Sequence, residues 1–340
     1  MRVLRPGEWL LAAATLLALP ALADDEARRW LASMSRALAA ENYQGELLHL
    51  ANGSGERLRI LHRVRDGRIT ERLVNLSGNG REMVRTDTEV QCYLPDQRKV
   101  VVEAYDEHGP LLGTLPAFDD RLEDNYRVAI AGRQRSALGG RAQIIAVTPK
   151  DSLRYGYRVW IDEHSHMPVQ TDLCDAQGRL LEQVLFTSLS MGATLPDAAF
   201  RPDVDAASYT WIREDHSALH TVEVALPWQL LSLPPGFRLS SSAAHRLPGS
   251  TQAVTHLVVS DGIASVSVFI EGPPAPPRRA FEGEGRIGSA FAYSTMVAGH
   301  QVTAVGEVPA ETVQAIAAGV TPAGAPAPRA AGLAAFAAPH

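Results

Sequence analysis

Hydrophobic residues recur along the chain with two different periods. Within residues 27–40 the apolar side chains follow the three- and four-residue spacing of one helix face, at Trp30, Leu31, Met34 and Leu38. From Tyr43 onward the period is two, and polar or glycine-rich turns separate the apolar runs. This change of period predicts one amphipathic helix whose apolar stripe packs on a sheet of many strands.

The strand pattern is clearest in the middle of the chain. Four runs joined by short turns have the length and alternation of strands, at 144–148, 154–161, 169–173 and 180–187. Earlier, Asp66-Gly67 is the two-residue signal of a tight hairpin. Consecutive strands with short turns predict an antiparallel sheet, because a Rossmann fold would alternate helices with strands.

The pattern weakens between 197 and 216 and then resumes, which predicts a second domain. Its expected elements are strands at 222–228, 255–259, 265–270, 290–298 and 301–306, followed by a helix at 310–318. The end of the chain is rich in Ala, Pro and Gly and is expected to be disordered. The predicted organisation is a large β domain at 24–205, a linker at 206–220, a small α+β domain at 221–320 and a disordered tail at 321–340.

The first 23 residues have the features of a secretory signal peptide. Arg2 and Arg5 precede an apolar run at 9–18, which ends in the small-residue site Ala21-Leu22-Ala23. The run is too short to span a bilayer, which needs about 20 residues. We therefore expect an exported protein that works outside the cytoplasm.

Export changes the meaning of the two cysteines, Cys92 and Cys174. An oxidising compartment allows one disulfide to form and persist, and both residues fall in strand-like runs. They are a candidate disulfide, and two buried free thiols are the alternative.

Charge and motifs exclude several classes of function. The formal net charge is −6, which is unfavourable for binding nucleic acid. The zinc-protease, serine-hydrolase, Walker and Cys-x-x-Cys motifs are absent from the sequence, and the match to Gly-x-Gly-x-x-Gly at 283–288 lies between a Pro-rich loop and a strand-like run. The polar cluster at 162–166 resembles a hairpin turn more than a metal site. We expect no cofactor, no metal and no enzymatic activity, although catalytic groups brought together only in space remain a third alternative.

Several runs of residues carry a resemblance to a known family. They are Glu71–Glu82, Val90–Pro95, Tyr157–Asp162, Met167-Pro168, Asp175–Gly178, Leu233–Phe237 and Gly306–Pro309. Taken together and in this order, they are similar to the MucB/RseB family, exported regulators of the envelope-stress sigma factor.

The resemblance implies a fold and a function. The fold would be α+β and mostly β, with an N-terminal half-open antiparallel barrel covered by helices, similar to lipoprotein carriers, and a smaller C-terminal α+β domain. Such proteins bind the periplasmic part of a membrane-spanning anti-sigma factor (MucA/RseA-like), protect it from regulated proteolysis and so repress envelope-stress and alginate genes. Lipid or lipopolysaccharide signals release the anti-sigma factor from such proteins. A periplasmic carrier of lipid or lipoprotein is the alternative function, and self-association into a homo-oligomer stays open.

Two sets of candidate site residues follow. An inward stripe on the predicted barrel is the candidate lipid cavity, consisting of Tyr157, Val159, Ile161, Val169, Leu173, Val184 and Phe186. Trp228 and Phe237, near the start of the small domain, are candidate anchors for the anti-sigma factor. In both sets the alternative is ordinary packing, within the core or around the joint between the domains.

Overall fold

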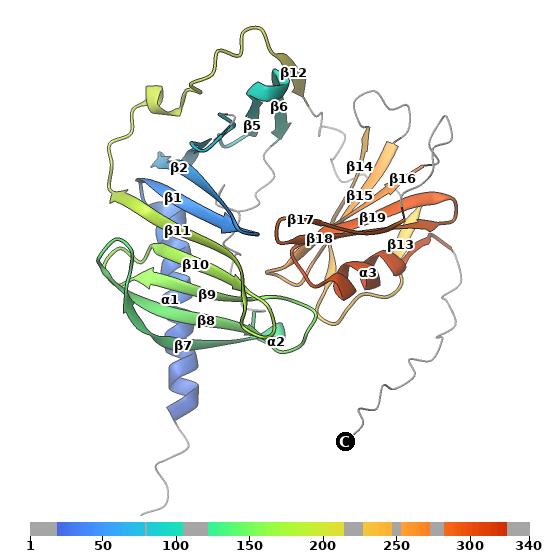
Figure 1. The fold of residues 1–340 in the computed structure, drawn as a ribbon, viewed down its shortest axis with the longest axis horizontal. Helices are drawn as coiled ribbons and strands as arrows, with labels where there is room; N and C mark the ends of the chain where they lie inside the picture. Colours follow the sequence, from blue (N-terminus) through green and yellow to red (C-terminus); the bar gives the residue numbers. More distant parts are fainter. Residues whose placement is uncertain are drawn as a thin grey trace, which may run out of the picture. The chain divides into compact units, whose positions relative to one another are not determined.

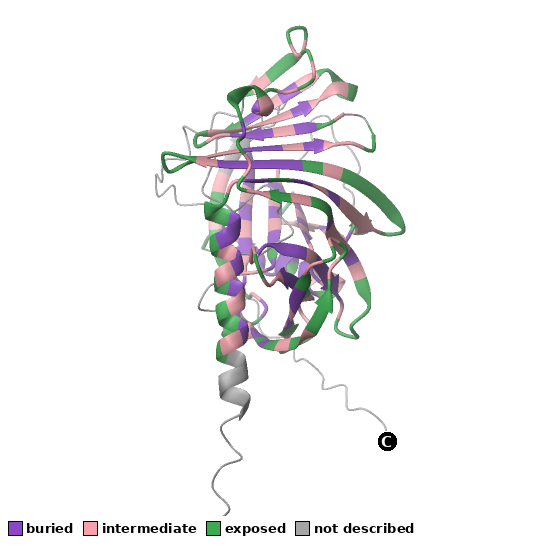
Figure 2. Ribbon diagram, turned by 90° about the vertical axis from the view of Figure 1, so that its left-hand side faces the viewer, coloured by how far each residue is buried: buried purple, intermediate pink, exposed green. Residues whose placement is uncertain are grey.

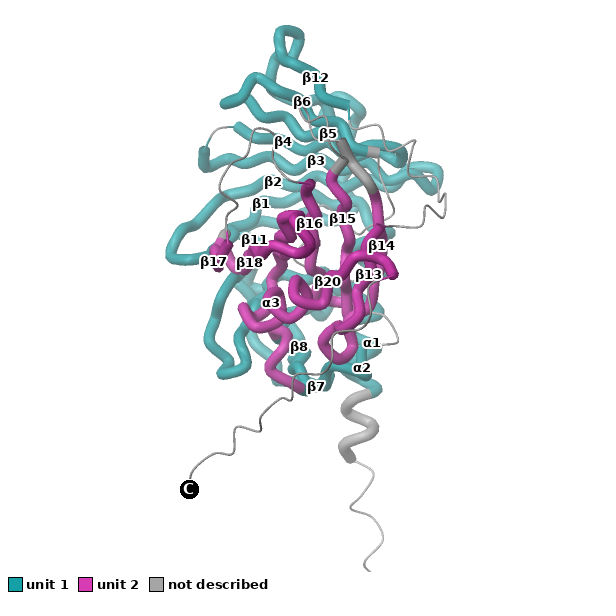
Figure 3. The backbone as a smooth tube through the Cα atoms, turned by 90° about the vertical axis from the view of Figure 1, so that its right-hand side faces the viewer, with its two compact units in different colours: residues 1–150, 156–214 teal, residues 151–155, 215–340 magenta. Residues whose placement is uncertain are grey.

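The computed structural model describes residues 19–78, 80–104, 122–213, 227–246, 253–272 and 282–324. The chain forms two compact units, coloured separately in Figure 3. The first consists of residues 1–150 and 156–214, and the second of residues 151–155 and 215–340. The second unit therefore includes a short segment from the middle of the chain, which the sequence pattern did not predict. Residues 1–18, which hold most of the predicted signal peptide, lie outside the described residues.

The first unit is a large sheet with one long helix. Its helices are α1 (Leu19–Ala40) and α2 (Leu122–Asn125), with 3-10 turns η1 (Pro95–Gln97) and η2 (Asp197–Phe200). Its strands are β1 (Tyr43–Ala51), β2 (Ser54–Arg65), β3 (Arg68–Asn75), β4 (Glu82–Arg85), β5 (Glu89–Leu94), β6 (Lys99–Ala104), β7 (Tyr126–Arg135), β8 (Arg141–Pro149), β9 (Gly156–Asp162), β10 (Pro168–Cys174), β11 (Leu180–Met191) and β12 (Thr210–Arg213).

These twelve strands form one open sheet in the order β12-β6-β5-β4-β3-β2-β1-β11-β10-β9-β8-β7. All neighbours are antiparallel except β12, which pairs in parallel with β6 and departs from the antiparallel sheet that the pattern predicted. The sheet bends beside α1, and its end strands β12 and β7 are not paired with each other (Figures 1 and 2). The predicted half-open, helix-covered barrel is confirmed.

Helix α1 packs on the sheet by the predicted apolar stripe. Its contacts are with β7 and β8. The buried side chains lie at helical spacing, at Ala27, Leu31, Met34, Ala37 and Leu38. Trp30, which the periodicity placed on the same stripe, is half-buried and lies against the ring of His166, with 5.4 Å between ring centroids.

The predicted hairpin at Asp66-Gly67 is confirmed and joins β2 to β3. Both residues have positive φ, 53° for Asp66 and 75° for Gly67, as a type I′ turn requires. Arg65 and Arg68 face each other across it, which fixes the register of the two strands.

The second unit is a six-stranded sheet covered by one helix. Its elements are β13 (Trp228–Leu230), β14 (Arg238–Arg246), β15 (Ala253–Ser260), β16 (Ser265–Glu271), β17 (Gly283–Ile287), β18 (Ala290–Val297), β19 (His300–Gly306), α3 (Ala310–Ala318) and β20 (Val320–Pro322). The sheet has the order β14-β15-β16-β19-β18-β17, and α3 packs on β18 and β19. The core between helix and sheet includes Val266, Val268, Val302, Val313 and Ile316. The α3 prediction is confirmed, and the glycine-rich motif at 283–288 is mostly strand β17.

Two expectations for this unit are corrected. Thr321 and Pro322, expected in the disordered tail, pair with Gln229 and Trp228 in a two-stranded sheet of β20 and β13. Of the strand expected at 222–228, only Trp228 is in a strand, and residues 222–226 lie outside the described residues, as do residues 325–340.

Candidate functional site

The candidate lipid stripe lies on strands β9, β10 and β11 of the first unit, but most of its residues are tightly packed core. Val159 and Ile161 have no exposed surface, and Leu173 and Phe186 are also buried. Tyr157 and Val184 are only half-buried. Val159 pairs with Ile145 on β8 and with Thr171 on β10, both buried, so it is surrounded within the sheet.

The predicted stripe places Val169 on the wrong face of the sheet. The β9–β10 register shifts between Pro168 and Gln170, which places Gln170 opposite Trp160. Val169 then packs with Trp160 and Ala142 in a separate cluster. A bulge of one residue moves a side chain to the other face of a sheet, and simple alternation cannot foresee it.

Within the described residues, a cavity of about 270 Å³ lies elsewhere, over β1, β2 and β11. Its lining consists of Gln44, Gly45, Glu46, Arg59, Ser188, Leu189 and Ser190. Five of these seven residues have polar side chains, and none is among the seven predicted lipid-contacting residues.

A row of polar side chains crosses strands β1 to β4 and is buried. Tyr43, His62, Glu71 and Arg85 follow one another in register, and none is more than 6% exposed. Tyr43 stacks on the ring of His62 with 4.7 Å between centroids, and Arg85 donates to Glu71 at 2.7 Å. The second Glu71 oxygen lies 3.8 Å from His62 Nε2. Buried charges need such partners.

This row predicts that the first unit loses stability in acid. Burial lowers the pKa of His62 below its usual 6.5, despite the nearby Glu71 carboxylate. The unfolded chain therefore takes up the proton more readily, and the stabilisation present above about pH 6.5 is lost as the pH falls. The measurement is the denaturant midpoint of the first unit between about pH 7.5 and pH 5. His62→Gln should flatten the dependence, whereas His164→Gln, in an exposed turn, should leave it as in the wild type. Equal slopes for all three proteins would contradict the prediction.

The two partner-binding candidates are buried in the second unit. Trp228 is 8% exposed and Phe237 is 4% exposed, and both belong to the core that α3 covers. His300 packs edge-on against Trp228, with 4.9 Å between ring centroids. Both side chains therefore pack in the core of the second unit, and their role as anchors for the anti-sigma factor stays a proposal.

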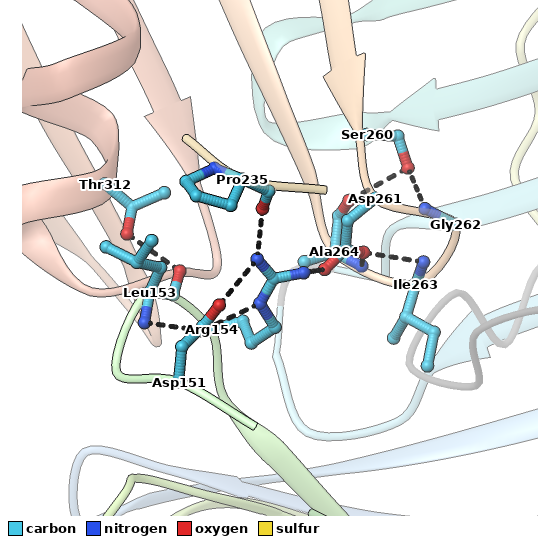
Figure 4. Close-up of polar contacts among 10 residues, drawn as sticks. All are labelled: Asp151, Leu153, Arg154, Pro235, Ser260, Asp261, Gly262, Ile263, Ala264 and Thr312. Atoms are coloured by element: carbon cyan, nitrogen blue, oxygen red, sulfur yellow. Dashed lines mark hydrogen bonds and ion pairs between the residues drawn. The ribbon is translucent and has the colours of Figure 1, made fainter. Parts of the chain in front are cut away.

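Beside Phe237 lies a polar cluster that the sequence reasoning missed (Figure 4). Arg154 has no exposed side-chain surface and pairs with Asp261, also fully buried, at 2.6 Å. Its guanidinium lies 5.0 Å from the centre of the Phe237 ring. The strand expected at 154–161 in fact begins at Gly156, which leaves Arg154 in the preceding loop. The sequence signals were Asp151 three residues before Arg154, and the turn-forming pair Asp261-Gly262.

The cysteines do not form the predicted disulfide. Both are free, on β5 and β10, with the five strands β4, β3, β2, β1 and β11 between them in the sheet. Burial, with the Glu103 charge, raises the pKa of Cys92 to about 11, and burial also raises that of Cys174. The disulfide prediction is wrong, because alternation placed each cysteine in a strand without placing the strands relative to each other.

The polar cluster at 162–166 is a hairpin turn. The Asp162 carboxylate accepts hydrogen bonds from the backbone of His164 and Ser165 and from the Ser165 hydroxyl. His166 has a positive φ of 58°. In the part of the chain that the structure describes, no group of three or more His, Cys, Asp or Glu side chains could hold a metal ion. Over the same residues, no helix is both long and apolar enough to cross a membrane.

Comparison with known proteins gives consistent matches over both units. Residues 26–204 match the family model for the MucB/RseB N-terminal domain, and residues 223–321 match that for the C-terminal domain. The sigma factor AlgU regulatory protein MucB of Pseudomonas aeruginosa is 32% identical, over 94% of this chain and 98% of that protein. The sigma-E factor regulatory protein RseB of Escherichia coli K12 is 26% identical, over 84% of this chain and 88% of that protein.

Solved structures extend the match to the fold. MucB in the complex of Pseudomonas aeruginosa MucA and MucB superposes with a TM-score of 0.68 at 29% identity. That alignment covers 87% of this chain and 99% of the other. A second structure, of MucB in complex with MucA(peri), gives a TM-score of 0.67 at 30% identity, over 87% of this chain and 98% of the other.

Proposed function

The chain belongs to the MucB/RseB family of sigma factor regulatory proteins, and we propose that it binds the periplasmic region of a MucA-like anti-sigma factor. By this binding it protects the anti-sigma factor from regulated proteolysis and so represses an AlgU- or sigma-E-type sigma factor. The signal-peptide pattern supports action in the periplasm.

One observation carries this proposal. Two solved structures hold MucB together with MucA, and MucB aligns with this chain over 87% of its length, at 29% and 30% identity. The family models match residues in both units, so the similarity includes the second unit as well as the sheet. A simple lipid or lipoprotein carrier has no need of the second unit, which favours the regulator over the carrier.

Release by lipid or lipopolysaccharide is the second part of the proposal. A ligand releases a partner only if it binds the free protein better than the complex, by a factor of about 10⁴ for nearly complete release. An acyl chain supplies roughly 0.8 kcal/mol per buried methylene. Tyr157 and Val184, the half-buried members of the stripe, are the residues that an acyl chain can contact without replacing core packing.

The proposal predicts saturable binding of a single partner. The mature chain should bind the purified periplasmic segment of the anti-sigma factor from the same organism, and lipopolysaccharide should raise the Kd. Fluorescence anisotropy of the labelled segment measures both effects. The cytoplasmic segment of the same anti-sigma factor is the control and should not bind. Equal binding of both segments, or of neither, would contradict the proposed function.

A protease assay tests the consequence of binding. Addition of the mature chain should slow cleavage of the full-length anti-sigma factor by the periplasmic protease that initiates its degradation. Lipopolysaccharide should restore cleavage at the concentration that raises the Kd. Protection without measurable binding would point to inhibition of the protease and against the proposal.

A further inference from the structure

The loop between β8 and β9 belongs to a different unit from the strands that it joins. Residues 151–155 are part of the second unit, whereas Lys150 and Gly156 on either side belong to the first. The chain therefore passes between the units at this loop as well as after Glu214.

Arg154 holds this loop within the second unit through every part of its guanidinium (Figure 4). One terminal nitrogen donates to Asp261 at 2.6 Å, and the other donates to the carbonyl of Pro235 at 2.5 Å and to Asp151 at 3.1 Å. Nε donates to the other oxygen of Asp151 at 3.0 Å. A planar guanidinium with this set of fixed acceptors has one orientation, which a lysine could not reproduce.

The acceptors are themselves fixed. The second oxygen of Asp261 accepts hydrogen bonds from the backbone of Ile263 at 2.9 Å and Ala264 at 2.8 Å, so this carboxylate organises the β15–β16 turn. Pro235 lies in the turn between β13 and β14. Arg154 thus joins two turns of the second unit that are far apart in sequence.

The loop backbone has a third attachment. The hydroxyl of Thr312 on α3, a residue with no exposed surface, donates to the carbonyl of Leu153 at 2.7 Å. The Leu153 amide in turn donates to Asp151 at 3.0 Å. The five-residue segment is therefore held by the two turns and by the helix that covers the core.

The flanks of the loop are equally constrained in the first unit. The Lys150 amide donates to the carbonyl of Asn125 at 2.9 Å. A Cβ atom on Gly156 would lie 2.9 Å from both Pro149 Cδ and the carbonyl of Val147. Because both flanks are tightly packed, the loop could absorb little of a displacement of β9, and the displacement would reach Arg154.

We propose that Arg154 is a positioning residue that couples the ligand state of β9 to partner binding by the second unit. This inference rests on the proposed function, because β9 carries Tyr157 of the lipid stripe and the second unit carries the candidate partner anchors Trp228 and Phe237. A ligand that displaces β9 pulls on residues 151–155, and the Arg154 contacts transmit the change to the turns at Pro235 and Asp261. The coupling is carried by a contiguous set of bonded groups.

The test is the effect of lipopolysaccharide on the Kd of the anti-sigma factor segment. Wild type and the double variant Arg154→Met, Asp261→Asn are compared as full mature chains, since removal of both charges leaves neither group uncompensated in the core. For the wild type, lipopolysaccharide should raise the Kd by about tenfold or more, within the usual range of allosteric coupling. For the double variant, partner binding should persist, and the increase should fall below about threefold.

A control variant removes an Arg–Asp ion pair of the first unit, whose arginine is mostly exposed. Arg179 and Asp175 pair at 2.7 Å in the β10–β11 turn, entirely within the first unit. The variant Arg179→Met, Asp175→Asn should respond to lipopolysaccharide as the wild type does. Thr312→Val keeps the Arg154 ion pair but removes the bond to Leu153, so its response should be intermediate, and it decides the question if the double variant does not fold.

The outcomes separate this inference from the proposed function. Failure of the wild type to bind the segment would contradict the proposed function itself. If the wild type binds the segment but lipopolysaccharide does not change the Kd, there is no ligand effect for Arg154 to transmit, and the inference would be wrong. A full wild-type response in the folded double variant, or in Thr312→Val when the double variant does not fold, would also overturn it.

Discussion

Replacing Asp261 with alanine is expected to destabilise the second unit by about 3–5 kcal/mol, the usual cost of breaking a buried ion pair from one side. Arg154 has no exposed surface and would lose its fully buried carboxylate partner, keeping only the partly exposed Asp151. The substitution also removes the acceptor for the backbone amides of Ile263 and Ala264. The loss should exceed that for a surface substitution several-fold.

The measurement is denaturant unfolding followed by the fluorescence of Trp228, the tryptophan of the second unit. The reference protein starts after the predicted signal peptide and so lacks Trp9, and replacing its Trp30, Trp160 and Trp211 with phenylalanine removes the signal of the first unit. Glu284→Ala is the control, since it removes one exposed hydrogen bond to Gln314 and should change stability by about 0.5 kcal/mol or less. A loss below about 1 kcal/mol for Asp261→Ala would show that the pair is hydrated or dispensable.

Replacing Val159 with aspartate is expected to unfold the first unit or to cost it about 4 kcal/mol or more, because a buried carboxylate would have no partner. Val159 has no exposed surface and lies between the buried residues Ile145 and Thr171. The same change at half-buried Val184 should leave the unit folded and weaken lipopolysaccharide-dependent release.

Circular dichroism with denaturant titration measures stability in both variants, and the anisotropy assay measures release. Val184→Ala is the matched control, because it keeps an apolar surface and should retain release. A folded Val159→Asp protein would contradict the tight packing of Val159 between strands β8 and β10. Unfolding of Val184→Asp would show that Val184 is core and would remove it from the proposed lipid contacts.

The sequence predicts those helices and turns for which a short-range signal is sufficient. The helix at 27–40 and the helix at 310–318 were predicted because apolar spacing reports one buried face, and that face does not depend on distant residues. The hairpin at Asp66-Gly67 was predicted because positive φ is a property of the turn residues themselves. The family resemblance was likewise carried by short runs along the chain.

The candidate site was predicted less well, because burial and register depend on partners. Alternation assigned Val169 to the lipid stripe, and the bulge at Pro168 placed it with Trp160. It also placed Cys92 and Cys174 in strands, which says nothing of the five strands between them. Trp228 and Phe237 were selected as large aromatic residues, and only the packed second unit shows that both are buried.

By itself, then, the sequence determined the period of each element, the turns and the family of this chain, since each of these is encoded in neighbouring residues. The tertiary structure alone decided where the charged residues of the loops would lie. The apolar pattern placed Arg154 at the start of a strand, yet Asp261, 107 residues after Arg154, pairs with this arginine in a fully buried ion pair. The physical reason is desolvation, because a charge enters the core only where folding brings a complementary group to meet it.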